Sequence, residues 1–535
     1  MSPHYLSVSN GLEILALVGM AISVYQLIFN KYQTWTFVLQ LLCYQSIYKT
    51  GIVFMNFQWD VLLLEMTWLA VLSTLLPSIS FHLIRALGFR LMFQSGVSKL
   101  LSGCPTWWGL TALDHHFQTQ CLPTPLAHFA HENIPAYFKK YMVAGVFYLQ
   151  LVTSFFFYGP RYSRFLAGCL HVGMQISIIL TGNYNFFNLL AIVLLVPCFT
   201  GPELFIWNLL KSKKFSKMVT NVVDILLLPI LTLVCFNKYV GPDDKGEPSL
   251  ILDMYDLLFH LDTWMFPLAI LLLLLSVGLA LRNLSKSQTK IIFTLTLCVS
   301  YFFALKSTRD LVDKSRPWSK NLGLITNASA SKHDPRFWNA RLLGIAKHYD
   351  FGSSYGLFAR MTGVKNGRPE LIVELSDDPN KVEYETLYFE YKPSAPYTTL
   401  PIVAPHQPRL DWQFWFAALQ KKGSEVGWMW TFLYRLMEGS EDVWALLDHW
   451  NNNHFGPAHR PKRVRVRRHF YGFTDKNMSA KERDLKAIYS ENDTWYQNHD
   501  YVQTNINWIK PFEQDTPWLQ DHLKKLKIMG IVFLK

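Results

Sequence analysis

Cysteine is scarce in this chain and confined to one part of it. Only seven cysteines occur among 535 residues, and the last of them is Cys298. No two of them form a CxxC pair, so zinc-ribbon and thioredoxin-type sites lack their usual sequence support. Residues 307–535, which we call the tail, contain no cysteine. We therefore expect it to be held together by its core.

Charged residues are also few, and they are unevenly distributed. They make up 17% of the chain, whereas 50% of the residues are hydrophobic. The apolar residues crowd into roughly the first 300 positions, and the charged residues crowd into the rest. This asymmetry predicts that the first region of the chain lies in lipid and the second in water.

The net charge of +12 has a simpler explanation than a nucleic-acid partner. Many basic residues lie in short loops between apolar stretches, as in residues 211–217 and 282–290, where they fix the orientation of a membrane protein. We expect membrane lipid as a partner and no nucleic acid.

Ten apolar stretches are candidate membrane spans, since a spanning helix needs about 20 mostly apolar residues. The second and fourth are weak because they contain several polar or charged residues. Each could be a helix buried inside a bundle or one lying at the membrane interface. The stretches are residues 11–29, 34–55, 61–81, 83–101, 138–158, 163–181, 184–201, 218–236, 264–281 and 290–306. The sequence thus predicts a polytopic α-helical membrane bundle of about ten spans over residues 1–306.

The two basic loops are expected on the cytoplasmic side. Because successive spans cross the membrane in alternating directions, loop 102–137 and the tail would then lie on the other side, in a lumen. A lumenal tail would make its sequons, Asn327, Asn477 and Asn492, acceptors for N-glycosylation. Ten spans would also leave the N-terminus in the lumen, although no ordinary signal peptide precedes the first stretch.

The tail, residues 307–535, is predicted to be an α+β domain with a β-sandwich-like sheet and a helical insertion. Alternating residues predict strands over 370–375, 383–391 and 463–473. Periodic apolar residues predict helices over 412–420, 426–437 and 441–450. Asp411 and Ser440 are the expected N-caps of the first and third of these helices, and Gly439 ends the second.

Seven stretches of the chain, in order, resemble the lipase maturation factor family. They are residues 57–65 (FQWDVLLLE), 104–125 (CPTWWGLTALDHHFQTQCLPTP), 182–190 (GNYNFFNLL), 354–369 (SYGLFARMTGVKNGRP), 405–418 (PHQPRLDWQFWFAA), 435–442 (RLMEGSED) and 464–474 (VRVRRHFYGFT).

This resemblance implies a multi-pass membrane protein of the endoplasmic reticulum that helps immature secretory proteins, above all dimeric lipases, to mature. The family has no established catalytic residues, so the resemblance implies no enzyme, cofactor or metal. It also implies an additional apolar helix before the segment corresponding to residues 2–29, which would give an odd number of spans and a cytoplasmic N-terminus.

The membrane half is also similar in pattern to vitamin K-dependent carboxylases. An integral-membrane enzyme is therefore the alternative, with Glu65 and Lys99 as a buried acid–base pair. The same two residues could instead belong to structural polar pairs inside the bundle. A transporter would show internal repeats, and no convincing repeat is present.

Loop 102–137 is the richest candidate site in the sequence. Its acidic and histidine side chains could form a metal or proton-transfer site, or could simply hydrogen-bond within a folded loop. Cys104 and Cys121 could close the loop with a disulfide in an oxidising lumen. The polar candidates are Asp114, His115, His116, His128 and His131.

Aromatic and charged residues of the tail are candidates for client binding. Arg409, Asp411, Trp412 and Trp415 combine the residue types that are common in binding hot spots. The same residues are equally typical of a partly buried core. In residues 463–467, valines alternate with arginines, which predicts a strand with one apolar face and one cationic face.

Overall fold

The computed structural model describes most of the N-terminal apolar region and much of the tail. The described residues are 8–75, 77–200, 217–242, 246, 248–251, 352–378, 383–394, 398–420, 426–448, 454–474, 495–497, 507–513, 517, 519–521 and 524. They belong to two compact units. We call Met1–Thr111, Tyr137–Ile176 and Phe187–Arg360 the helical unit, and Ala112–Ala136, Ser177–Phe186 and Met361–Lys535 the sheet unit.

The sheet unit draws residues from both sides of the predicted boundary at residue 306. Most of loop 102–137 belongs to it, because α6 (Ala112–Thr119) and α7 (Pro125–Asn133) lie in that loop.

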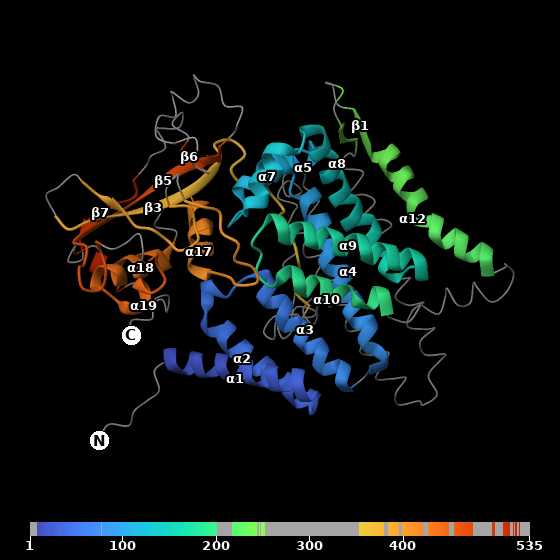
Figure 1. The fold of residues 1–535 in the computed structure, drawn as a ribbon, viewed down its shortest axis with the longest axis horizontal. Coiled ribbons are helices and arrows are strands. Elements are labelled where there is room, and N and C mark those ends of the chain that lie inside the picture. The colour runs from blue at the N-terminus through green and yellow to red at the C-terminus, as the bar shows by residue number, and fades with distance from the viewer. Residues whose placement is uncertain are drawn as a thin grey trace, which may run out of the picture. The chain divides into compact units, whose positions relative to one another are not determined.

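Helices occupy all eight predicted apolar stretches that fall within the described residues (Figure 1). The other two, 264–281 and 290–306, lie outside those residues. The helices are α1 (Val8–Phe29), α2 (Gln33–Thr50), α3 (Gln58–Leu75), α4 (Pro77–Leu101), α8 (Ala136–Phe147), α9 (Arg161–Thr181), α10 (Phe187–Thr200) and α12 (Lys217–Tyr239). The 3₁₀-helix η1 (Ile52–Phe54) and the short helix α5 (Pro105–Trp108) complete the early part of the chain.

Three helical segments of the described residues are long and apolar enough to cross a membrane: Ser9–Phe29, Ala136–Tyr158 and Arg161–Thr181. The second is composite, since α8 runs into the π-helical η2 (Tyr148–Val152) and the 3₁₀-helical η3 (Thr153–Tyr158). Helix α10 is apolar but shorter. The prediction of a helical region with membrane spans is thus confirmed, and the number ten is not.

Helix α4, the weak fourth stretch, is the central helix of the helical unit. It packs against α3, α10, η2 and η3. Leu87 and Leu91 are buried, and so are its charged residues Arg85, Arg90 and Lys99. Of the two alternatives for this stretch, the structure supports a helix buried inside the bundle.

Asp224 of α12 caps the N-terminus of α9. Its carboxylate accepts hydrogen bonds from the backbone N–H groups of Tyr162 and Ser163, at 2.8 and 2.9 Å. These two N–H groups belong to the first turn of α9, where no intrahelical acceptor exists. The buried acid therefore caps the N-terminus of α9 from a separate helix.

The sheet unit contains an antiparallel sheet of five strands in the order β4-β3-β5-β6, with β7 also paired to β5 (Figure 1). Its strands are β4 (Glu385–Thr386), β3 (Arg368–Ser376), β5 (Arg463–Phe473), β6 (Trp495–Gln497) and β7 (Asn507–Glu513). Three further helices belong to this unit: α17 (Arg409–Ala418), α18 (Gly427–Glu438) and α19 (Glu441–Trp444). In the helical unit, β1 (Val240–Pro242) pairs with β2 (Pro248–Leu250).

The sheet is buried on both faces along β3. Ile372, Tyr471 and Phe473 form one cluster with residues of α6 and α7. On the opposite face, Val464 and Val466 are fully buried. The described residues of this unit thus form an α+β layer arrangement, and the predicted β-sandwich is not confirmed.

Several predicted boundaries are right, and three are wrong. One of the three is the helix predicted over 441–450, because α19 already ends at Trp444. Strand β5 has its predicted bounds, and α18 ends at Gly439, whose φ of 76° is left-handed. Helix α17 instead begins at Arg409, so Asp411 lies within its first turn and is not its N-cap. The carboxylate of Asp411 accepts hydrogen bonds from the backbone of Tyr391 and Lys392. The predicted strand 383–391 shrinks to β4, because the N–H of Phe389 donates to Ser394 Oγ and that of Tyr391 donates to Asp411 instead of to a neighbouring strand.

Candidate functional site

Two buried polar networks bring together stretches that are far apart in the sequence. The first, which we call the Glu65 centre, consists of Glu65, Arg90 and Tyr355 in the helical unit. The Arg90 guanidinium forms an ion pair with Glu65 Oε1, and the Tyr355 hydroxyl donates to Glu65 Oε2 at 2.7 Å. All three side chains are at most 5% exposed. A carboxylate that is satisfied on both oxygens is a structural anchor in a buried site.

The Glu65 centre differs from the predicted acid–base pair of Glu65 with Lys99. The Lys99 ammonium donates instead to the carbonyls of Ser95 and Leu357, at 3.1 and 2.9 Å. It also lies 5.2 Å from the centre of the Trp107 ring. The pairing of Glu65 with Lys99 was therefore wrong, because Arg90 lies nearer to Glu65 than Lys99 does in the folded bundle.

Residues 352–360 are fastened to α3, α4 and the turn after α4 at several points. Besides the Tyr355 hydroxyl, the Tyr355 N–H donates to Gln94 Oε1 at 2.7 Å. The Trp107 indole donates to the Phe358 carbonyl at 2.9 Å, and the Arg360 guanidinium donates to the Ser102 carbonyl at 2.7 Å. Burial raises the pKa of Tyr355 well above its usual range. The phenol therefore stays protonated and serves as a donor.

The second network, the Arg368 centre, consists of Arg368, Glu370 and Lys392 in the sheet unit. Arg368 Nη2 lies 2.6 Å from Glu370 Oε1, and Lys392 Nζ lies 3.3 Å from Glu370 Oε2. The side chains of Arg368 and Glu370 have no exposure at all. Burial lowers the pKa of Lys392 from its usual value, and the nearby carboxylates oppose that shift.

Arg368 also ties β3 to the C-terminal end of α6 and the residues that follow it. Its guanidinium donates to the carbonyls of Gln118, Gln120 and Cys121, the last at 2.7 Å. Arg368 and these three residues belong to two of the stretches quoted above, 354–369 and 104–125. The Arg368 centre therefore joins two motifs that are separated by more than two hundred residues.

Asn183, from a third motif, holds two further segments of the sheet unit. Its amide nitrogen donates to the carbonyls of Leu122 and Pro401, at 3.1 and 2.9 Å. Its amide oxygen accepts from the backbone N–H groups of Val403 and Ala404, at 2.8 and 3.2 Å. The side chain thereby satisfies four backbone groups of two loops, which is a positioning role.

The histidines of loop 102–137 have separate structural partners. His128 Nε2 lies 3.4 Å from Glu132 Oε1, one helical turn away on α7, and 3.1 Å from the Thr474 carbonyl. The rings of His128 and His131 both pack edge-on against Phe473. Among the described residues, no metal-ligand group forms in this loop. The folded-loop alternative is the one that the geometry supports.

The predicted disulfide between Cys104 and Cys121 is not formed in the structure, where both are buried free thiols. Cys104 Sγ lies 3.2 Å from Thr106 Oγ1. Burial raises the pKa of the Cys121 thiol well above its usual value, so this thiol carries little of the reactive thiolate.

The four candidate client-binding residues divide by exposure. Asp411 and Trp412 are 3% and 1% exposed, so both belong to the core of the sheet unit. The Trp412 ring meets the Tyr184 ring edge-on, with the centroids 6.1 Å apart. Arg409 and Trp415 are partly exposed, and the Trp415 indole donates to the Thr119 carbonyl at 3.0 Å. The predicted glycosylation sites Asn327, Asn477 and Asn492 lie outside the described residues.

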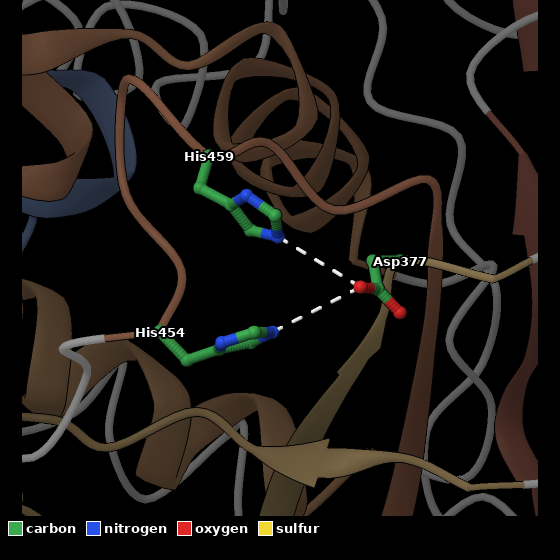
Figure 2. Close-up of side chains that lie close together, drawn as sticks. All are labelled: Asp377, His454 and His459. Atoms are coloured by element: carbon green, nitrogen blue, oxygen red, sulfur yellow. Dashed lines mark ion pairs between the residues drawn. The ribbon is translucent and has the colours of Figure 1, made fainter.

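One surface group was not predicted from the sequence: Asp377 with His454 and His459, whose side chains point toward one another (Figure 2). It is the only set in the described part of the chain whose ligand atoms could share a metal ion. The two histidines are separated by only five positions in HFGPAH, a signal that could have been noticed. The Glu65 and Arg368 centres gave no comparable local signal.

These features define a helical membrane protein that carries an α+β unit. Residues 1–205 match the family model of the lipase maturation factor transmembrane domain, and residues 351–493 match that of the lipase maturation factor C-terminal domain. The chain belongs to the lipase maturation factor family.

Individual relatives agree with the family models. Lipase maturation factor 2 of Xenopus tropicalis is 34% identical over 504 residues, which cover 88% of this chain and 69% of the relative. The human lipase maturation factor 2 is 34% identical over 508 residues, covering 88% of this chain and 70% of the relative. Lipase maturation factor 1 of the mouse is 24% identical over 452 residues, covering 82% and 65%. No solved structure matches the chain.

Proposed function

We propose that this chain is a membrane factor of the endoplasmic reticulum that assists the folding, assembly or maturation of secreted lipases. The observation that carries the proposal is family membership across both halves of the chain. The names of its relatives point to a maturation factor rather than an enzyme.

The use of the motif residues supports this proposal. Four buried residues from the stretches that resemble the family use their polar groups to bind other segments of the same chain. They are Glu65, Tyr355, Arg368 and Asn183. A scaffold needs such fastening in order to present a stable surface to a client. Arg409 and Trp415, which stay partly exposed, are the remaining candidates for client contact.

The proposed topology places the helical unit in the membrane and the tail in the lumen. The three apolar helical segments support the first half of this statement. The basic loops 211–217 and 282–290 support a cytoplasmic side for themselves and hence a lumenal side for the tail. Immature lipases passing through the lumen would then meet the sheet unit.

The alternative is an integral-membrane enzyme related to vitamin K-dependent carboxylases. Its sequence argument relied on Glu65 and Lys99 as an acid–base pair. Glu65 is instead neutralised by Arg90, and Lys99 donates to backbone carbonyls. These partners favour the maturation factor over the enzyme.

The test is expression of the chain with a secreted dimeric lipase in cells that lack their own maturation factor. We expect the specific activity of the secreted lipase, measured as activity per mass of lipase, to rise. A Trp415→Ala variant tests the client surface, and Arg435→Gln on α18 is the control. Equal specific activity with and without a correctly folded chain would contradict the proposal.

A further inference from the structure

Asp377, His454 and His459 converge at one end of the sheet (Figure 2). His454 Nε2 lies 3.9 Å from Asp377 Oδ2, and His459 Nε2 lies 3.8 Å from the same oxygen. One ligand atom from each of the three side chains lies within 4.8 Å of the other two. The three side chains are about half exposed, so an ion could reach them from solvent.

The backbone that carries these side chains is held in place by the sheet. Asp377 directly follows β3, and the loop of residues 454–459, which we call the histidine loop, lies just before β5. The final pair of the β3–β5 ladder is Ser376 with Arg463, and the Lys462 N–H donates to the Ser376 carbonyl at 2.9 Å. The end of β3 and the end of the loop are therefore fixed against each other before any ion binds.

The histidine loop has its own anchor. Phe455, between the two histidines, is only 8% exposed, and its ring lies 4.8 Å from the His454 ring and 5.6 Å from the His459 ring. The Gly456 N–H donates to the His459 carbonyl at 3.0 Å, which closes the loop. Both imidazoles consequently project from a small closed turn.

The separations suit a bound ion better than hydrogen bonds. Distances of 3.8 and 3.9 Å are too long for a hydrogen bond. Ligand atoms around a tetrahedral zinc ion lie about 3.3 Å apart, since Zn–N and Zn–O bonds are about 2.0–2.1 Å. The two carboxylate–imidazole pairs would close by about 0.5 Å on binding. The ligand atoms of the two histidines, which lie within 4.8 Å of each other, would close by at most about 1.5 Å, and exposed side chains achieve both by rotation.

We propose that Asp377, His454 and His459 form a binding site for a divalent transition-metal ion of the zinc class. Imidazole nitrogens with a carboxylate suit such ions, whereas magnesium and calcium prefer oxygen ligands alone. Glu385 Oε1 lies 4.0 Å from His454 Nε2 and is placed to complete the set, or water fills the fourth position. The bound ion links the end of β3 to the loop that precedes β5.

The test is titration of zinc into the purified full chain in detergent after removal of metals by a chelator, with a competing indicator dye at pH 7.5. We expect one saturable site. His454→Gln, His459→Gln and Asp377→Asn should each weaken it more than about tenfold, because each removes a direct ligand. His406→Gln, at an exposed histidine elsewhere in the sheet unit, should leave it unchanged. Failure of zinc to saturate any site, or equal binding by all four variants, overturns the proposal.

A second measurement separates a metal site from a simple cluster of ion pairs. Zinc affinity should fall steeply between pH 7.5 and pH 5.5, because the imidazoles must be neutral in order to bind. Affinity that stays constant down to pH 5.5 would show that the histidines are not ligands.

Discussion

Glu65, Arg368 and Asp411 are ionisable side chains with almost no exposure to solvent. Such groups are costly to bury, and each is matched by oppositely charged or hydrogen-bonding partners. Breaking one of these sets should therefore cost more than any single surface contact.

Arg368 is the residue whose loss should matter most to the sheet unit. Arg368→Met leaves the Glu370 carboxylate with Lys392 alone and removes the donor to three carbonyls at and just after the end of α6. We expect the sheet unit to lose about 3–5 kcal/mol of stability. The midpoint of thermal unfolding of the purified chain checks this.

The matched control for that change is Arg435→Gln. Arg435 pairs with Glu438 on the surface of α18 at 3.3 Å, and both side chains are 32% exposed. Exposed pairs of this kind contribute about 0.5 kcal/mol or less. If the two variants lowered the midpoint equally, the Arg368 centre would not be the anchor that we describe.

Asp411 makes the stability of the sheet unit depend on pH. Burial raises its pKa to about 6, against the opposing effect of two backbone hydrogen bonds. The pKa of an unfolded Asp is about 3.9. The folded state therefore holds the proton more tightly. The resulting stabilisation is complete below about pH 4 and is lost as the pH rises to about 6, with a size on the order of 3 kcal/mol.

Asp411→Asn should abolish that part of the pH dependence. The Asn side-chain oxygen can still accept from the backbone of Tyr391 and Lys392, while no charge has to be buried. We expect the unfolding midpoint of the variant to exceed that of the unmodified chain at pH 7 and to match it near pH 4. Parallel midpoint curves from pH 4 to pH 7 would contradict the raised pKa.

At the residue level, the sequence shows that a side chain is unusual without showing which partner it meets. Glu65 and Lys99 were both recognised as unusual, but Glu65 pairs with Arg90 and Tyr355. Tyr355 is separated from Glu65 by 290 positions. No local pattern reports a contact at that distance along the chain.

Among the structural elements, the turn before β3 depends on glycine. Gly363 has a φ of +66°, and an added Cβ would lie 2.4 Å from the Gly367 carbonyl oxygen and 2.7 Å from the Thr119 methyl. Gly363→Ala should destabilise the sheet unit by about 1–3 kcal/mol through backbone strain, apart from the steric clash. Resistance of the purified chain to limited proteolysis measures this loss.

Gly456→Ala is the companion variant for this experiment. Gly456 lies in the same unit, and a Cβ there would meet nothing within 4 Å. The variant should resist proteolysis as well as the unmodified chain does. Equal sensitivity of the two variants would show that the turn at Gly363 tolerates a side chain.

Element positions were predictable where local periodicity was strong. The alternation of Val464 and Val466 with arginines predicted β5 with its observed bounds, and the valines are indeed buried. The start of α17 was missed because Asp411 was assigned to capping. Its carboxylate instead binds the backbone of residues 391 and 392, a tertiary contact that overrides a local preference.

At the scale of the whole molecule, hydropathy located the helices but not the compact units. The sheet unit combines Ala112–Ala136 and Ser177–Phe186 with the tail. Both of these segments lie within residues 1–306, the region predicted to be the membrane bundle. A hydropathy profile describes each stretch alone. The division into units depends on contacts such as those of Arg368 and Asn183, which join stretches of different hydropathy.

The proposed lumenal position of the tail predicts that its sequons are glycosylated. Asn327→Gln, Asn477→Gln and Asn492→Gln should each remove one endoglycosidase-H-sensitive step from the mobility of the chain on a gel. Asn283→Gln should have no effect, since its sequon lies in a loop that we assign to the cytoplasm. A shift with Asn283→Gln alone would reverse the proposed topology.

The central claim is that the chain helps a lipase to reach its native state. The most direct measurement is the fraction of intracellular lipase that sediments as the native dimer in cells lacking their own factor. We predict that expression of the chain moves lipase from aggregates into the dimer. An unchanged dimer fraction, with the chain folded and its tail glycosylated, would contradict the proposed function.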